Sequence, residues 1–191
     1  MTDGQHARKY SLLRHRVDRF LAGAVLTGNP RDLRDACRHV LAGGGKRLRA
    51  VLLLLACEAV GGTPRKALSA GAAMEIMHNF TLVHDDIMDH APTRRGRPTV
   101  HLRWGLNTAL LAGDVLLGLP YRILLRTPEA DSRRIVSLFT TGVIDVCEGQ
   151  ALDLEFERRT SVTVAQYFAM IEKKTGRLIS MAAEMGGVIG G

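Results

Sequence analysis

Residues 65–89 read RKALSAGAAMEIMHNFTLVHDDIMD, a mostly apolar stretch that closes with the acidic run HDDIMD. Pro64 stands directly before this stretch, and proline is well suited to the first turn of a helix. We therefore predict one helix over residues 65–89, with Asp85 and Asp89 near its C-terminal end.

Helical patterns continue on both sides of this stretch. Apolar residues recur at helical spacing over residues 6–26, and the run Gly28-Asn29-Pro30 follows as a stop signal. Further helices are predicted over residues 31–41, 46–60, 109–126, 128–157 and 164–185. Residues 91–98 contain two prolines and a glycine, which predicts a loop. Because strand alternation is hard to find, we expect an all-α fold of long helices joined by short loops.

The composition agrees with this fold class. The chain has 191 residues, of which 46% are apolar, 24% are charged and 5% are aromatic. These fractions are typical of a globular chain, and few aromatics beside abundant Leu and Ala favour packed helices over a β-sandwich. At this length a single core is the expectation, so we predict one domain over residues 1–191.

Charge and cysteine usage exclude several classes of protein. The net charge of +7 arises within residues 1–49, where 11 Lys and Arg stand against 4 Asp and Glu, so we expect no nucleic-acid partner. Cys37, Cys57 and Cys147 are widely separated, which argues against a disulfide scaffold or a zinc site. The longest purely apolar run, residues 50–57, is too short for a transmembrane segment, and the N-terminus lacks a signal-peptide core. We therefore expect a cytoplasmic protein.

The acidic run at residues 84–89 is the sharpest motif. On a helix, Asp85 and Asp89 differ by about 40° in direction and lie roughly 6 Å apart along the axis, while Asp86 points about 100° away from Asp85. Carboxylates at this spacing repel each other, so a positive partner is expected. A few hard oxygen ligands suit Mg²⁺, whose coordination is completed by water and substrate phosphates. The alternative is an acidic helical turn in solvent.

Three arginines, Arg94, Arg95 and Arg97, follow the acidic run closely. They either neutralise the aspartates at the surface, where ion pairs contribute little, or hold phosphate oxygens with their guanidinium groups. Carboxylates that bind Mg²⁺ beside arginines that bind the same diphosphate would form a coherent site.

A second basic motif, GGGKRLRA, covers residues 43–50. Lys46 and Arg49 would be about 60° apart on a helix, so both can address one anion. The motif is not a nucleotide P-loop, because Arg47 stands where that motif requires Ser or Thr. The alternative is a basic helix start exposed to solvent.

His78 lies seven residues before Asp85 and shares its helix face within about 20°. A single histidine on an apolar helix is more often a core residue than a ligand. Glu75 and His78 also form a Glu-x-x-His pair, as in di-iron bundles, but the sequence holds no second pair, so this interpretation is weak.

Two later segments carry polar groups. Gln150 and Asp153 stand on adjacent turns of one helix face, which is either functional or a polar seam in solvent. Lys174 and Thr175 interrupt a helix with a cation and a hydroxyl group, or form an exposed turn.

Together these segments resemble the trans-isoprenyl diphosphate synthases, the polyprenyl synthetase family. The matching motifs occur in the family's order: GGGKRLRA at Gly43, HNFTLVHDDIMD at His78, RRGRPTVH at Arg94, GQALDLEFE at Gly149 and KTGRLIS at Lys174. The resemblance implies an isoprenoid-synthase-type helical bundle and an Mg²⁺-dependent prenyltransferase. In that reaction an allylic diphosphate (dimethylallyl, geranyl or farnesyl) ionises, isopentenyl diphosphate attacks the carbocation, and a proton is lost. The resemblance also implies a homodimer.

The resemblance implies a role for each matching residue. The residues implied to hold isopentenyl diphosphate are Lys46, Arg49, His78 and Arg95. Those implied to contact the allylic diphosphate are Arg94, Lys174 and Thr175. Those implied to bind Mg²⁺ are Asp85, Asp86 and Asp89, with Gln150 and Asp153 as a supporting pair near the metal and the substrate. Asp85, Asp89 and Lys174 are the expected catalytic residues.

Residues just before the first aspartate of such enzymes limit product length. Phe80 is bulky and Thr81 is small, which resembles the short-chain type, with a twenty-carbon product favoured and a fifteen-carbon product next. Replacing Phe80 with Ala should therefore lengthen the products.

One departure from the family pattern is a missing second aspartate-rich motif after Asp89. We therefore expect a C-terminally truncated bundle with an incomplete metal site and doubtful activity by itself. Two alternatives stay open: a non-catalytic relative that binds prenyl diphosphates or regulates a partner, and a terpene cyclase. A cyclase would not need Lys46, Arg49 and His78 for a second diphosphate.

Overall fold

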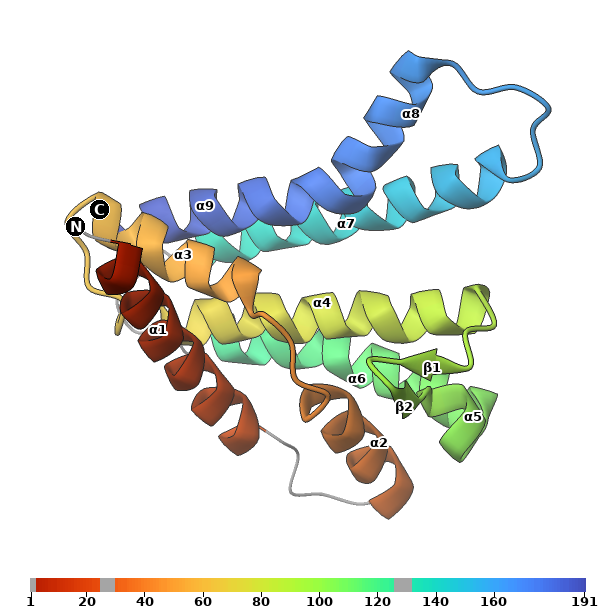
Figure 1. Cartoon of the computed structure of the whole chain (residues 1–191), viewed down its shortest axis with the longest axis horizontal. Coiled ribbons are helices and arrows are strands. Elements are labelled where there is room, and N and C mark those ends of the chain that lie inside the picture. The colour runs from red at the N-terminus through yellow and green to blue at the C-terminus, as the bar shows by residue number, and fades with distance from the viewer. Residues whose placement is uncertain (1–2, 25–29, 126–131) are drawn as a thin grey trace. The chain divides into compact units, whose positions relative to one another are not determined.

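The computed structural model describes residues 3–24, 30–125 and 132–191 (Figure 1). The chain divides into two compact units: unit 1 comprises residues 1–51 and 68–127, and unit 2 comprises residues 52–67 and 128–191. Each unit is described by itself. Both consist almost entirely of helices, which confirms the predicted all-α class.

Unit 1 contains most of the predicted functional residues. Its elements are α1 (Asp3–Gly23), α2 (Arg31–Leu41), the start of α3 (Leu48–Ala59), α4 (Leu68–Met88), β1 (Thr93–Arg94), β2 (Arg97–Pro98), α5 (Val100–Trp104) and α6 (Leu106–Leu124). The helices α4 and α6 lie side by side (Figure 1). Gly113 of α6 permits this approach, because a Cβ atom there would overlap the ring of His84 on α4. This close packing fixes α4, the helix that carries the aspartates.

Unit 2 contains the remainder of α3, α7 (Ser132–Phe156), α8 (Val164–Ile171), the π-helix η1 (Glu172–Gly176) and α9 (Arg177–Gly190). The helix α7 packs against η1 and α9. Gly149 of α7 faces the backbone of Lys174, and Gly142 faces the side chain of Met181. Two glycines on one helix therefore let neighbouring segments approach closely.

The predicted loop at residues 91–98 is wrong in part, because β1 and β2 form a small antiparallel hairpin there. Arg95 and Gly96, the two turn residues, have φ angles of 53° and 74°. A two-residue turn with both φ angles positive suits the twist of a hairpin. Strands of two residues are too short to show alternation. The helix α5 was likewise not predicted.

Other helix boundaries differ from the predicted ones by a few residues. The helix predicted over 65–89 spans 68–88, and the helix predicted over 46–60 spans 48–59. The helix predicted over 164–185 continues to residue 190 as α8, η1 and α9. The ends predicted at residues 26, 126 and 128 lie outside the described residues.

Among the described residues, α7 alone is long and apolar enough to cross a membrane by length and composition. This is weak evidence for a membrane span, because core helices of soluble proteins pass the same test.

Candidate functional site

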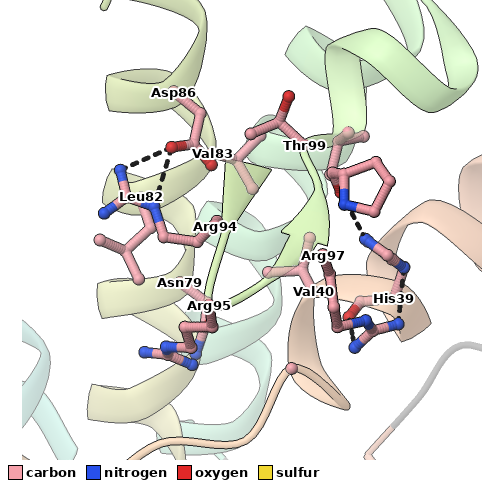
Figure 2. Close-up of a pocket in the computed structure, with 13 residues that line it drawn as sticks. His39, Val40, Asn79, Leu82, Val83, Asp86, Arg94, Arg95, Arg97 and Thr99 are labelled. Atoms are coloured by element: carbon pink, nitrogen blue, oxygen red, sulfur yellow. Dashed lines mark hydrogen bonds and ion pairs between the residues drawn. The ribbon is translucent and has the colours of Figure 1, made fainter. Parts of the chain in front are cut away.

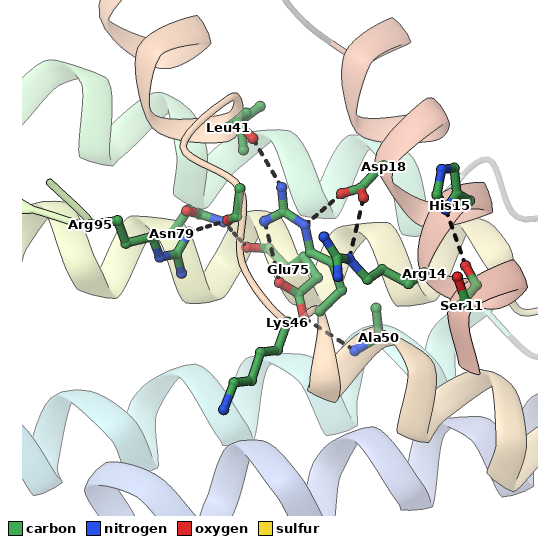
Figure 3. Close-up of polar contacts among 12 residues, drawn as sticks. Ser11, Arg14, His15, Asp18, Leu41, Lys46, Ala50, Glu75, Asn79 and Arg95 are labelled. Carbon is green, nitrogen blue, oxygen red and sulfur yellow. Dashed lines mark hydrogen bonds and ion pairs between the residues drawn. The ribbon is translucent and has the colours of Figure 1, made fainter. Parts of the chain in front are cut away.

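The glycine-rich turn before α3 places a buried arginine inside unit 1. Gly44 and Gly45 adopt φ angles of 72° and 135°, and Arg47 adopts 52°. The Arg47 side chain is buried, whereas the neighbouring Lys46 is exposed, and Figure 3 shows Lys46 extending away from Asp18 and Leu41. The expectation that Lys46 and Arg49 share one helix is wrong, because α3 begins at Leu48 and Lys46 belongs to the turn.

The hairpin contacts this turn through Arg95. The Arg95 guanidinium donates a hydrogen bond to the carbonyl oxygen of Gly44. The φ of Gly45 favours glycine, and a Cβ atom there would lie in tight contact, 3.1 Å, with Nη1 of Arg95. The structure therefore brings Arg95 to the motif that contains Arg49, and the shared role that the resemblance implies for these two residues stays a prediction.

Arg49 and His78 have buried polar atoms without partners. Nε of Arg49 and Nδ1 of His78 have no hydrogen-bond partner among the described residues. Burial lowers the pKa of His78 to about 3, and the positive charges of Arg49, Arg95, Arg94 and Arg47 act in the same direction. His78 is therefore a neutral imidazole near pH 7. Buried polar atoms are normally hydrogen-bonded. Within the described chain, Nη1 of the neighbouring Arg47 also lacks a hydrogen bond but has the Glu75 carboxylate 3.7 Å away, so a ligand is expected at Arg49 and His78.

Glu75 is the buried carboxylate within this group of cations. Its side chain is 3% exposed, and burial raises its pKa while Ala50, Arg47, Arg49 and Arg95 oppose the rise. We call Arg47, Arg49, Glu75, His78 and Arg95 the basic cluster. Neither Arg47 nor Glu75 was predicted as part of a diphosphate site. Glu75 had been considered only for di-iron binding, and the described residues contain no group of three or more His, Cys, Asp or Glu side chains able to hold a metal.

The acidic run occupies the end of α4. Asp86 is buried, and its Oδ1 accepts hydrogen bonds from Nε and Nη2 of Arg94 at 2.8 and 2.5 Å (Figure 2). This hydrogen bonding, assisted by the charges of the aspartates, raises the pKa of Arg94. Asp85 is half-buried and Asp89 is exposed. The neutralisation that the sequence offered as an alternative therefore holds for Asp86 and Arg94.

Asp85 and Asp89 suit a magnesium ion by their donor chemistry. Mg²⁺ binds oxygen ligands and is commonly held by one or two carboxylates together with waters and substrate phosphates. The absence of a three-residue cluster among the described residues is compatible with that coordination. Asp86 would have only its second oxygen available, because Arg94 occupies the first.

A small cavity lies beside the hairpin (Figure 2). Its volume is about 40 Å³, and its lining includes Asn79, Leu82 and Asp86 of α4 together with Arg94 and Arg95. Small-molecule sites have volumes of about 300–1,000 Å³. The candidate site is therefore defined by the polar groups around the hairpin and not by this cavity.

Phe80 and Thr81 occupy the turn of α4 that follows His78. Phe80 is buried, and its ring meets the ring of His84 edge-on with centroids 4.8 Å apart. The Thr81 hydroxyl donates a hydrogen bond to the carbonyl oxygen of His78 at 2.8 Å. Their influence on product length stays a prediction.

The polar residues predicted after residue 149 belong to unit 2. Lys174, in η1, donates a hydrogen bond to Asp153 of α7, so two residues predicted for separate roles form one ion pair. Oε1 of Gln150 is buried and has no hydrogen-bond partner in the part of the chain that the structure describes, and Thr175 is exposed. Short π-helical turns inside α-helices occur frequently at functional sites, so a functional role for η1 is consistent with its geometry. The roles that the resemblance implies for these four residues stay predictions.

Comparisons with known proteins agree on one family. The family model described as "Polyprenyl synthetase" matches residues 30–191. Geranylgeranyl diphosphate synthase from Methanosarcina mazei is 44% identical over 177 residues, which cover 92% of this chain and 55% of that protein. Geranylfarnesyl diphosphate synthase from Natronomonas pharaonis is 36% identical over 208 residues, covering 99% of this chain and 61% of that protein.

A solved structure shows the same fold. The crystal structure of geranylgeranyl pyrophosphate synthetase from Pyrococcus horikoshii superimposes with a TM-score of 0.92 at 39% identity, covering 97% of this chain and 58% of that one. The predicted isoprenoid-synthase-type bundle is thereby confirmed. The chain spans little more than half the length of the relatives it matches.

Proposed function

Because the chain belongs to the polyprenyl synthetase family, we propose that it takes part in prenyl transfer from an allylic diphosphate to isopentenyl diphosphate. The observation that carries this proposal is the basic cluster, in which the buried Nε of Arg49 and Nδ1 of His78 have no hydrogen-bond partner within the described parts of the chain. A diphosphate would supply the acceptor oxygen for Arg49. The names of the relatives favour an enzyme over a non-catalytic binding protein.

Isopentenyl diphosphate would be held by Arg49, His78, Arg95 and the exposed Lys46. Guanidinium groups bind phosphate oxygens through charge-assisted hydrogen bonds, which are roughly twice as strong as neutral ones. The neutral His78 can donate one N–H without adding charge. Because all four groups are side chains that can donate hydrogen bonds to phosphate oxygens, this binding needs no metal ion.

The allylic diphosphate would lie at the acidic end of α4. Asp85 and Asp89 are the proposed Mg²⁺ ligands, and the hydrogen bonds from Arg94 hold Asp86 beside them. Mg²⁺, when bound, stabilises the negative charge that develops on a departing diphosphate. Arg94 is 40% exposed even while paired with Asp86, so its guanidinium can also meet a phosphate oxygen.

The chain's own residues have two tasks in such a reaction. The cations stabilise the diphosphate as the C–O bond breaks with both electrons on oxygen. The apolar residues around Phe80 keep water from the carbocation until the double bond of isopentenyl diphosphate attacks it and a proton leaves. We propose a twenty-carbon product, with fifteen carbons as the next choice, since Phe80 limits the length.

The proposal includes the remaining assignments by resemblance. Lys174 and Thr175 would contact substrate phosphates, and Gln150 and Asp153 would support the metal. A cytoplasmic homodimer and the dimethylallyl, geranyl and farnesyl diphosphate primers are likewise proposed. These assignments rest on the family's motifs.

The test begins with calorimetric titration of the chain with isopentenyl diphosphate. We expect binding by the wild type, about tenfold or more weakened binding in Arg49→Gln, since a hydrogen bond to a charged group contributes about 1.5–3 kcal/mol, and unchanged binding in the control Arg31→Gln. Arg31 is an exposed arginine paired with Asp35 on α2, outside the basic cluster.

A second measurement asks for catalysis. The chain is incubated with isopentenyl diphosphate, each allylic primer in turn and Mg²⁺, and the products are separated by chain length. Elongated prenyl products support the enzyme, whereas binding without elongation favours the non-catalytic relative. A wild-type chain that binds neither diphosphate contradicts the proposal.

A further inference from the structure

Arg47 is a buried charge that contacts three elements of unit 1 besides its own turn. Its side chain is 3% exposed. Nε donates a hydrogen bond to Oδ1 of Asp18 on α1 at 2.8 Å, and Nη2 donates to the carbonyl oxygen of Leu41 at the end of α2 at 3.1 Å. Nη1 lies 3.7 Å from Oε2 of Glu75 on α4 (Figure 3). One guanidinium therefore fixes the turn before α3 to α1, α2 and α4.

Glu75 holds the other side of the same segment. Its Oε1 accepts a hydrogen bond from the backbone N–H of Ala50 at 3.3 Å, within the first turn of α3. Arg47 and Ala50 flank Leu48 and Arg49 in the sequence. The Arg47–Glu75 pair therefore fixes the backbone on both sides of Arg49.

Glu75 also faces the cations of the basic cluster. The positive charges of Arg47, Arg49 and Arg95 all act on its carboxylate. Like charges in a buried group repel one another, and a single carboxylate among them lowers that repulsion. Glu75 and His78 are three residues apart on α4, so the residue that orders Arg49 stands one helical turn from His78.

We propose that Arg47 and Glu75 are positioning residues. They hold Arg49 and His78 in the geometry that receives a diphosphate, but they do not contact the diphosphate themselves. This inference rests on the proposed function, because it concerns how the isopentenyl diphosphate site is built. Burying an ion pair is costly, and an apolar pair of similar size often gives equal or greater stability. A stabilising role alone therefore gives a poor account of the pair.

The test separates affinity from stability in the full 191-residue chain. Glu75→Gln keeps the size of the side chain and an oxygen for Ala50 but removes the charge. We expect isopentenyl diphosphate, titrated without metal ions and well below the unfolding temperature, to bind about tenfold more weakly to Glu75→Gln and to Arg47→Gln. The double variant should bind no more weakly than Arg47→Gln alone, because that change already breaks the pair with Glu75 together with the hydrogen bonds to Asp18 and Leu41. The control Arg31→Gln should bind like the wild type.

An apolar replacement gives the discriminating readout. In Arg47→Met with Glu75→Leu, we expect the thermal unfolding midpoint to recover toward that of the wild type while the affinity for isopentenyl diphosphate stays low. Binding of geranyl diphosphate with Mg²⁺, which depends on the aspartates, should change less than twofold in Glu75→Gln.

The possible outcomes are distinct. Wild-type affinity in Glu75→Gln overturns the positioning role and leaves the proposed function intact. Parallel losses for both diphosphates that follow the unfolding midpoint also overturn it, since they show a structural role. A wild-type chain that does not bind isopentenyl diphosphate contradicts the proposed function, and the inference falls with it.

Discussion

Arg49 and His78 carry more functional information than the aspartates do. Short acidic turns are common, and one of the three carboxylates here is already neutralised by Arg94. Nε of Arg49 and Nδ1 of His78 are buried in the same cluster without hydrogen-bond partners among the described residues, and each one forfeits the hydrogen bond it would make in water. The case for a diphosphate site therefore depends on these two atoms most of all.

His78 should make the chain sensitive to acid. Its pKa is lowered to about 3 by burial and by Arg49, Arg95, Arg94 and Arg47, whereas the unfolded chain binds the proton near pH 6.5. As the pH drops below 6.5, His78 binds a proton in the unfolded state but not in the folded state. Proton binding by His78 therefore destabilises the fold as the pH drops. Between pH 7 and pH 5 we expect a loss of up to about 2 kcal/mol in the free energy of unfolding.

Denaturant unfolding of the wild type and of His78→Gln at both pH values tests this expectation. The variant should lose less stability than the wild type, and His15→Gln, which removes an exposed histidine of α1, should behave like the wild type. Equal losses in the wild type and His78→Gln would show that the imidazole is protonated in the fold.

The elements differ in how well the sequence predicts them. The helix α2 was predicted with its exact bounds, because Pro30 and Gly43 punctuate a clear pattern. The hairpin and α5 were missed, because two-residue strands and a five-residue helix are shorter than any periodicity. The segment Lys173–Arg177 was expected to interrupt a helix, and the π-helix η1 (Glu172–Gly176) does interrupt it, at the place where the chain changes direction between α8 and α9 (Figure 1).

Gly149 should be essential for the packing of α7 against η1. A Cβ atom at Gly149 would overlap the backbone of Lys173 and Lys174, which cannot move as a side chain does. We expect Gly149→Ala to lower the free energy of unfolding by about 1–3 kcal/mol, as overpacked substitutions do. Thermal or denaturant unfolding measures this loss.

Gly187→Ala is the matched control on α9 of the same unit. No atom lies within 4 Å of a Cβ placed there, and alanine is the better helix former. This variant should be as stable as the wild type or more stable by up to about 1 kcal/mol. If both alanine variants had equal stability, the close approach at Gly149 would not constrain the fold.

For the whole chain, the membership of the candidate site stays a prediction from the family's motifs, and the structure corrects how some of its residues are arranged. Arg95 was expected near the basic motif and Arg94 near the acidic motif. In the hairpin, Arg95 contacts Gly44 of the basic motif and Arg94 contacts Asp86 of the acidic motif. Helical spacing was used to place Lys46 beside Arg49, which fails because the turn before α3 is not helical, whereas the role of Lys46 comes from the resemblance and stays a prediction. Arg47 and Glu75 were missed because Arg47 pairs with residues on α1, α2 and α4, one of which is Glu75. No local sequence pattern predicts such long-range contacts.

Taken as a whole, unit 1 should bind its two proposed substrates with opposite metal requirements. Isopentenyl diphosphate meets organic cations, so its affinity should be the same in EDTA and in Mg²⁺. An allylic diphosphate meets carboxylates that repel it unless a divalent cation intervenes. We expect geranyl diphosphate to bind at least about tenfold more tightly with Mg²⁺, a difference of ~1.4 kcal/mol.

Calorimetry on Asp85→Asn with Asp89→Asn decides between this arrangement and a single site for both diphosphates. The double variant should lose the Mg²⁺-dependent gain for geranyl diphosphate and keep its metal-free affinity for isopentenyl diphosphate. Asp114→Asn, at an exposed aspartate of α6, controls for the loss of a single surface carboxylate and should retain both behaviours. If isopentenyl diphosphate also required Mg²⁺, the basic cluster would not suffice to bind its diphosphate. The proposal that the cations and the aspartates bind different substrates would then be wrong.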